Sequence, residues 1–188
     1  MSGIINPINS NLFSELNDVI QNNTKEVKQY CFNNKIAFSS IIDNSLTIFV
    51  NNIGAMRMGP GNEFRKIEGT EILDKMHVCS IVPYTDESLL FVTATEGLFL
   101  LKNGILSAYD TELSSQLIKD NVYCAESNGK YISYGTVSNG VYIKDISTDN
   151  LMHLNTDSGL QNNTVLSMFY DSDGNLWLGL DKGIDMIS

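Results

Sequence analysis

The sequence has no run of about 18 apolar residues, the length that a membrane-spanning helix requires. Its longest apolar stretch surrounds Leu46 to Val50 and is far too short to cross a bilayer. The N-terminus has no lysine or arginine before residue 25 and no apolar stretch as long as that of an export signal. We therefore expect no membrane contact by this segment, which either stays where it is made or is a piece of a longer exported protein.

Basic residues are scarce. The 188 residues include 12 lysines and arginines against 22 aspartates and glutamates, a formal net charge of −10. Such a chain repels phosphate backbones and anionic membrane surfaces, which argues against nucleic-acid binding. The hydrophobic content of 43% and the presence of only three prolines exclude a disordered or collagen-like chain. A folded globular protein with a buried core is expected.

Metal-ligating and catalytic residue types are also few. Cys31, Cys79 and Cys124 are widely spaced without a C-x-x-C pair, so we interpret them as small buried side chains and expect no metal site. The two histidines, His77 and His153, have no carboxylate at a fixed spacing. No nucleophile, base and orienting group come together in the sequence, so we expect neither an enzyme nor a bound cofactor.

The chain does contain an internal repeat. Glycines at positions 54, 97, 140 and 183 are separated by three equal intervals of 43 residues. Each is followed by a short strand-like run, and glycine permits the positive φ of a turn that begins such a strand. Further β-rich runs begin at residues 36, 78, 122 and 165, and a third set lies between these runs and the glycines. A fourth strand is expected in three units, at residues 64–67, 105–109 and 151–154.

Four short antiparallel strands in about 43 residues are typical of a β-propeller blade. We therefore predict an all-β fold, a β-propeller of about four four-stranded blades that is part of a larger propeller. The predicted blades are residues 36–77, 78–121, 122–164 and 165–188, the last one incomplete. A β-sandwich with coincidental spacing is the alternative. Because the blades of a propeller cover one another on both faces, continuous apolar runs such as Leu89 to Thr93 are expected.

Residues 1–35 lie outside the repeat. Apolar residues among positions 12–20 could line one face of a short helix, and residues 24–32 could supply the missing outer strand of the fourth blade if the ring closed with four blades. Otherwise this segment belongs to a blade whose remainder is missing, or caps an exposed blade.

Two local features of the fourth blade allow competing interpretations. Asp171-Ser172-Asp173-Gly174-Asn175 has the alternating oxygens of a calcium loop, but Lys182 at the twelfth position has the wrong charge, so a hairpin turn is favoured. Trp177 could stack on a sugar ring, but in a middle strand we expect it to be buried between adjacent sheets.

If a ligand binds, the loops at one mouth of the ring are the expected place. The loops between the second and third strands carry polar residues just before the repeat glycines, which could hydrogen-bond hydroxyl groups or simply face water. These candidate ligand-binding residues are Asn52, Glu96, Asn139 and Lys182.

The fourth unit resembles the two-component regulator propeller repeat. The resemblance rests on Gly159-Leu160, then Val165, then Asp171-x-x-Gly174-Asn175-Leu176-Trp177-x-Gly179, and a closing Gly183-Ile184. The preceding units around Gly97 and Gly140 are similar to it, whereas residues 1–35 match poorly.

The family resemblance implies a function. It implies the periplasmic propeller of a Bacteroidetes sensor-regulator with a triple-tyrosine domain, in which the propeller detects a nutrient such as a carbohydrate ligand and transmits signals, often as a homodimer. The rest of the parent sensor protein is then the main partner. The alternative is a scaffold propeller that binds other proteins and no small molecule.

Overall fold

The computed structural model describes residues 28–85 and 87–188, and residues 36–188 form a compact unit. The strands in this unit form four separate antiparallel sheets, each built as a meander in which neighbours in sequence are neighbours in the sheet. Their bounds are β1 Ile36–Ile42, β2 Ser45–Val50, β3 Gly54–Met58, β4 Phe64–Lys66; β5 Val78–Pro83, β6 Leu89–Thr93, β7 Leu98–Lys102, β8 Ile105–Tyr109; β9 Val122–Ser127, β10 Tyr131–Thr136, β11 Val141–Asp145, β12 Leu151–Leu154; and β13 Val165–Tyr170, β14 Leu176–Leu180, β15 Ile184–Ile187.

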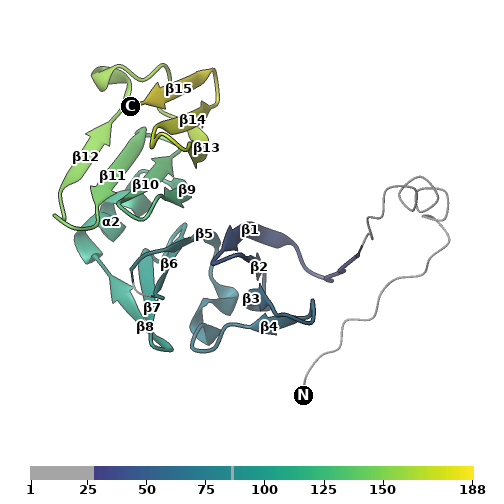
Figure 1. Ribbon diagram of the computed structural model, residues 1–188. Coiled ribbons are helices and arrows are strands. Elements are labelled where there is room, and N and C mark those ends of the chain that lie inside the picture. The colour runs from purple at the N-terminus through teal and green to yellow at the C-terminus, as the bar shows by residue number, and fades with distance from the viewer. Residues whose placement is uncertain (1–27, 86) are drawn as a thin grey trace, which may run out of the picture. The chain divides into compact units, whose positions relative to one another are not determined.

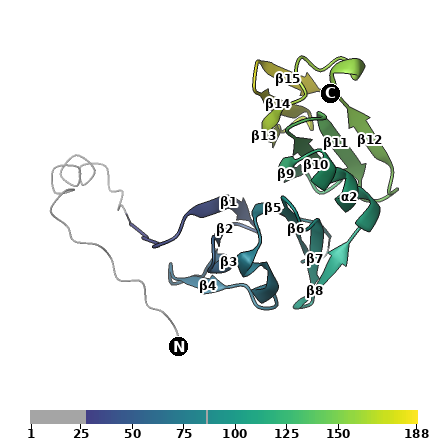
Figure 2. The same ribbon diagram turned by 180° about the vertical axis from the view of Figure 1, so that it is seen from behind.

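The four sheets follow one another in chain order (Figures 1 and 2). Their first strands are adjacent, since β1 contacts β5, β5 contacts β9, and β9 contacts β13. The fourth strands lie farthest from one another. This is a β-propeller of four blades, as the repeat predicted. The β-sandwich alternative is wrong, because the strands form four small sheets and not two broad ones.

Each pair of successive sheets encloses its own hydrophobic cluster. Phe49, Ile81 and Phe91 are buried between the first and second sheets. Corresponding clusters around Tyr134 and Leu178 fill the next two interfaces. The middle strand β6 is buried along its whole length, which confirms that its apolar run serves both faces of the blade. Hydrophobic burial between sheets is therefore what holds the blades together.

All four repeat glycines have positive φ, with values of 109° at Gly54, 91° at Gly97, 74° at Gly140 and 100° at Gly183. At Gly140 a Cβ atom would also lie 2.1 Å from the carbonyl oxygen of Leu154. The turn predicted at each glycine is confirmed, and at Gly140 close backbone packing adds a second reason for glycine.

Three short helices connect the sheets: the 3-10 helix η2 (Glu71–Lys75), α2 (Thr111–Lys119) and the 3-10 helix η3 (Thr156–Ser158). The sequence pattern predicted no helix in these connections. In α2, Asp110 caps the N-terminus by accepting a hydrogen bond from the backbone N–H of Leu113, at 3.2 Å. Leu113 and Leu117, one turn apart, are buried against the cluster between the second and third sheets.

The N-terminal predictions fall mostly outside the described residues. The helix expected within residues 9–23 and the first part of the closing strand lie there, while residues 28–32 have no strand assignment. In the described part of the chain the fourth sheet has three strands, in the order β13-β14-β15.

Candidate functional site

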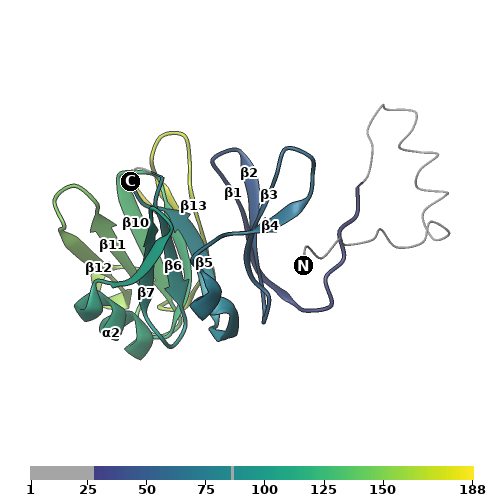
Figure 3. The same cartoon turned by 90° about the horizontal axis from the view of Figure 1, so that it is seen from below.

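The topology sorts the loops of every sheet to two ends. Because the strands are antiparallel, the loop between the second and third strands and the connection to the next sheet leave from the same end. Figure 3 shows α2 and η2 at this end, and the tips of the other hairpins at the opposite end. All four candidate residues lie in the second-to-third loops, so they occupy one end of the strands.

Three of the four candidates project into solvent, since Asn52, Glu96 and Lys182 are exposed. The side chain of Glu96 accepts a hydrogen bond from the neighbouring Thr95 hydroxyl, at 2.7 Å between Oγ1 and Oε1. Each residue belongs to a different sheet, and no contact joins any two of them in the described part of the chain. Their role in ligand binding stays a prediction.

Asn139 differs from the other three because both ends of its side-chain amide are hydrogen-bonded. Its Nδ2 donates to Asp120 Oδ2 at 3.0 Å and to the Tyr142 hydroxyl at 3.1 Å. Its Oδ1 accepts from Asn155 Nδ2 at 3.3 Å. Its backbone carbonyl lies 2.7 Å from His153 Nε2. These bonds hold Asn139 in position in the loop, and only one of the two lone pairs of its Oδ1 is used, so its role in ligand binding stays a prediction.

Asp120 is the centre of this network. It is the C-cap of α2 and is 6% exposed. The Tyr142 hydroxyl donates to its Oδ2 at 2.6 Å, and Gln116 Nε2 donates to the same atom at 2.8 Å. Burial acts to raise the pKa of Asp120, but the hydrogen bonds from Tyr142, Gln116 and Asn139 and the positive charge of Lys119 together outweigh it and lower the pKa below its usual value. The carboxylate therefore stays charged and holds the helix against the third sheet.

The sequence pattern indicated Asn139 as a candidate residue but gave no indication of its partners Asp120 and Tyr142. Asp120 lies 19 residues before Asn139, in a segment interpreted as a plain connection. The imidazole of His153 stacks on the Tyr142 ring, with centroids 4.3 Å apart. The one available signal was the Asp110 cap with leucines at helical spacing, which indicates a helix that ends near Asp120.

Trp177 is a correction, because the side chain is 42% exposed and not buried between sheets. Its indole Nε1 donates to Asp171 Oδ2 at 2.8 Å. Hydrogen bonds from Trp177 and Asn175 lower the pKa of Asp171 to about 2. Asp171 thus caps the turn before β14, accepting from the backbone N–H groups of Asp173 and Asn175. These contacts are those of the hairpin turn that was favoured over a calcium loop.

The exposure of Trp177 follows from its register. In the last three sheets, the second strand ends at the residue whose backbone N–H bonds to the carbonyl oxygen of the repeat glycine across the turn. These residues are Thr93, Thr136 and Leu180. The turn in the fourth sheet is one residue shorter, from Leu180 to Gly183. Trp177 lies three residues before the end of its strand. The residues at the same position in the first three sheets are Thr47, Leu90 and Ser133, which face the following sheet and are fully buried. No following sheet covers Trp177 in the described part of the chain.

Residues 28–85 and 87–188 have neither a metal-binding cluster nor a membrane-spanning helix. They contain no group of three or more His, Cys, Asp or Glu residues arranged to hold a metal ion. None of their helices has the length and hydrophobicity to span a bilayer. All three cysteines are free thiols. The expectation that they are buried is wrong, because Cys31 is exposed and Cys79 and Cys124 are only half-buried.

The fourth sheet carries the family signature. Residues 159–182 match the family model described as two component regulator propeller. The matched segment runs from the C-cap of η3 through β13 and β14 to the repeat turn. This chain contains a two component regulator propeller repeat. The resemblance recognised in the sequence is confirmed.

Among curated proteins, the chain is similar to Histidine kinase P4 of Formosa agariphila, with 31% identity over 85 residues. These residues make up 43% of this chain and 6% of that relative. The chain therefore spans a small part of the length of the relative that it matches.

Among solved structures, the chain resembles two extracellular domains from Bacteroides thetaiotaomicron. One is described as belonging to a one component system and has a TM-score of 0.59 at 26% identity. The match covers 83% of this chain and 22% of that domain's chain. The other is described as belonging to a hybrid two component system and has a TM-score of 0.62 at 17% identity. The match covers 88% of this chain and 24% of that domain's chain. The second likeness concerns the fold alone.

Proposed function

We propose that this chain is part of the extracytoplasmic sensor propeller of a two-component-type regulator, and that it binds a ligand without transforming it. The observation that carries the proposal is the two component regulator propeller repeat, which falls on a blade of the matching fold. The 26% identity with an extracellular domain of a one component system supports the same role. On this proposal the chain works in the periplasm as one segment of a longer, membrane-anchored sensor.

The proposed ligand is a glycan or a similar nutrient, bound at the end of the strands where α2, η2 and the repeat turns gather. Asn52, Glu96 and Lys182 offer exposed hydrogen-bonding groups there. The Asp120 network beneath them keeps the third-sheet loop rigid, which reduces the entropy lost on binding. Transmission then occurs through a change in the relative position of domains or of two receptor copies.

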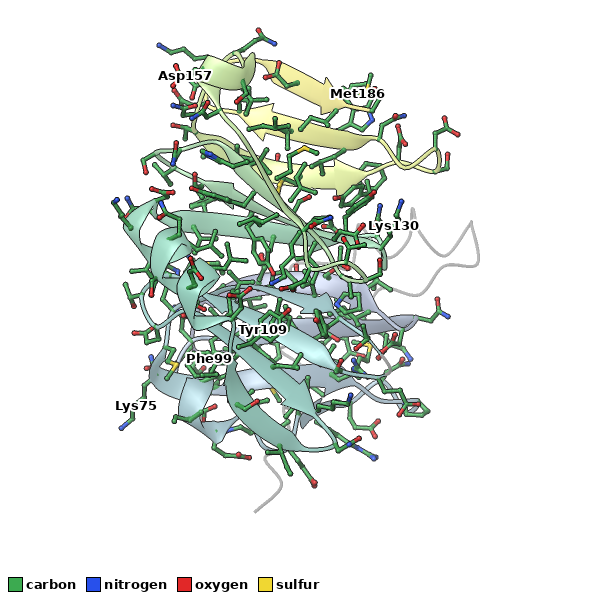
Figure 4. The ribbon with its side chains drawn as sticks, turned by 90° about the vertical axis from the view of Figure 1, so that its left-hand side faces the viewer. Lys75, Phe99, Tyr109, Lys130, Asp157 and Met186 are labelled. Carbon is green, nitrogen blue, oxygen red and sulfur yellow. The ribbon has the colours of Figure 1, made fainter. Side chains whose placement is uncertain are left out.

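The open face of the fourth sheet supports membership of a larger propeller. Phe169, Trp177 and Met186 are directly opposite one another across β13, β14 and β15, and all three are exposed. Figure 4 shows Met186 on this last sheet. The corresponding face of each earlier sheet is covered by the next one, so we propose that a further propeller sheet of the parent protein packs here.

Calorimetry on the full ectodomain of the parent sensor tests the sensing function. The ectodomain is titrated with a panel of purified glycans, and its melting temperature is measured at each concentration. A true ligand at about 100 times its dissociation constant stabilises the folded state by about 2.7 kcal/mol, which is readily detected. A panel in which no glycan changes melting or association contradicts the proposal.

A protein-binding scaffold is the second candidate function. The row of Phe169, Trp177 and Met186 favours the scaffold in the case where no further sheet of the parent packs on it, because contiguous apolar surface marks protein contact sites. Purification of binding partners from periplasmic extract with the wild-type ectodomain, and with a Phe169→Ser variant as control, separates the two. A partner lost with Phe169→Ser, together with no response to any glycan, would favour the scaffold.

A further inference from the structure

A groove with a volume of about 540 Å³ lies between the first and second sheets, near the hairpin tips and away from α2. The first sheet contributes Arg57, Arg65 and Lys66 from β3 and β4. The second sheet contributes Glu87 and the turn at Asn103 and Gly104. None of these residues was a candidate in the sequence analysis, and none belongs to the Asp120 network.

The charge of the groove is opposite to that of the chain. Three of the 12 basic residues in a chain of net charge −10 line this one surface. Glu87 is the single acidic residue among the lining residues. A local concentration of positive charge on an acidic protein attracts small anions and focuses them at that place.

Arg57 and Arg65 are directly opposite each other in the ladder between β3 and β4. Like charges directly opposite each other repel and destabilise a sheet. Each basic residue of the groove has an acidic partner: Asp43 Oδ2 lies 3.4 Å from Arg57 Nη2, Glu63 pairs with Arg65, and Lys66 pairs with Asp74. The first two pairs are largely exposed to solvent and therefore weak.

Arg57 also has an unused donor. Its Nε is buried and has no hydrogen-bond partner in the described part of the chain. Thr47 Oγ1, which belongs to the residue opposite Arg57 on β2, is buried without a partner as well. Buried polar atoms are normally satisfied, so these two unpartnered atoms mark an unsatisfied polar spot in the wall of the groove.

We propose that this groove is a binding site for a small carboxylate-bearing ligand. The fork of N–H donors on arginine matches the two oxygens of a carboxylate, and the paired arginines offer two such forks side by side. The volume lies within the range of small-molecule sites, which is roughly 300–1,000 Å³. The ligand class rests on the proposed function of glycan sensing: it is an acidic sugar of the uronic acid type, held at a second subsite, separate from the end where the repeat turns gather.

The opposite wall gives the site its selectivity. Glu87 can accept hydrogen bonds from sugar hydroxyls, and its charge disfavours dianions such as sulfate. A bound uronate would join Arg57 and Arg65 of the first sheet to Glu87 of the second. Binding therefore stiffens the interface between two blades.

Titration of the 188-residue chain with galacturonate, with galactose and with inorganic sulfate, followed by NMR or calorimetry, tests the site. We expect galacturonate to bind at least about ten-fold more tightly than galactose or sulfate. Arg65→Gln is the main variant, because its side chain is 73% exposed and its loss should leave the fold intact. It is expected to weaken galacturonate binding about ten-fold or more.

Lys130→Gln is the matched control, because it removes the same charge from an exposed residue of the third sheet, outside the groove. It should change galacturonate affinity by less than about two-fold. Equal binding of galacturonate and galactose, equal binding of sulfate, no binding of galacturonate, or an unaffected Arg65→Gln variant would each overturn the site.

The outcomes also separate this site from the sensing function. If the parent ectodomain responds to a glycan but Arg65→Gln leaves that response and uronate binding unchanged, the groove proposal fails and the sensor proposal stands. If galacturonate binds through Arg65 while no glycan affects the parent ectodomain, the groove stands and the sensor proposal fails.

Discussion

Tyr134 and Tyr142 show how differently two buried hydroxyl groups can serve one blade. Both rings are buried in the cluster between the second and third sheets. The Tyr142 hydroxyl bonds to the Asp120 carboxylate, whereas the Tyr134 hydroxyl is buried and has no partner in the described part of the chain. A buried polar group without a partner costs free energy, while a bond to a buried charge contributes it.

Replacing each tyrosine by phenylalanine should therefore have opposite effects. Tyr142→Phe is expected to lower the free energy of unfolding by on the order of 2 kcal/mol, because Asp120 loses its shortest hydrogen bond. Tyr134→Phe is expected to leave it unchanged or to raise it by up to about 1 kcal/mol. Urea unfolding of the two variants, which remove the same atom from the same cluster, provides the comparison. Equal losses in both would mean that the hydroxyl partners do not determine the difference.

The residue-level predictions from sequence succeeded where local backbone geometry decides. The repeat glycines need positive φ because of the turn itself, and their spacing showed this in advance. The contacts of Asn139 depend on Asp120 and Tyr142, which only folding brings together. The hydrogen bonds that hold Asn139 in its loop therefore did not follow from the sequence pattern.

At the scale of the element, the turns between second and third strands are the most constrained parts of the fold. Gly140 has a φ of 74°, and a Cβ there would lie 2.1 Å from the Leu154 carbonyl oxygen. Gly129 has a similar φ of 83° but has nothing within 4 Å of a Cβ. The two glycines therefore share the backbone cost of substitution and differ in packing.

Gly140→Ala is expected to be clearly more destabilising than Gly129→Ala. The common cost of the left-handed conformation is about 1–2 kcal/mol, and the clash with backbone at Gly140 adds to it. Thermal or urea unfolding of both variants measures the difference directly. A Gly140→Ala variant no less stable than Gly129→Ala would show that the neighbouring strand yields without cost.

Among the elements, the strands were predictable and the helices were not. The starts of β1, β5, β9 and β13 agree with the residues at which β-rich runs were expected to begin. The helix α2 was missed because its nine residues carry only Leu113, Leu117 and Ile118 as apolar markers, and helical spacing is weak evidence in so short a segment. Its helical state is stabilised by packing against the third sheet and by the caps at Asp110 and Asp120.

For the whole molecule, the face formed by Phe169, Trp177 and Met186 provides a direct test of how the blades continue. Trp177 is the single tryptophan of the chain and lies on that face. In the 188-residue chain, its fluorescence should have the long-wavelength emission of a hydrated indole and be readily quenched by acrylamide. In a longer form of the parent that includes the proposed next sheet, emission should shift to shorter wavelength and quenching should fall.

An Asp171→Asn variant is the control for this measurement, because it weakens the hydrogen bond to the indole without covering the face. The Trp177 fluorescence of this variant is measured in both the 188-residue chain and the longer form. Equal quenching of Trp177 in the long and short forms would contradict a further sheet at this position.

The sequence by itself determined the repeat, the strands and the turns, because continuous apolar runs and conformationally demanding glycines act over a few residues. Only the tertiary structure decided which residues meet: that Asn139 is held by Asp120, that Trp177 faces outward, and that Arg57 and Arg65 line one groove with Glu87. The physical reason is that burial, pairing and charge depend on neighbouring sheets. A shift of one residue in a turn, as at Gly183, changes which face of a blade a side chain occupies.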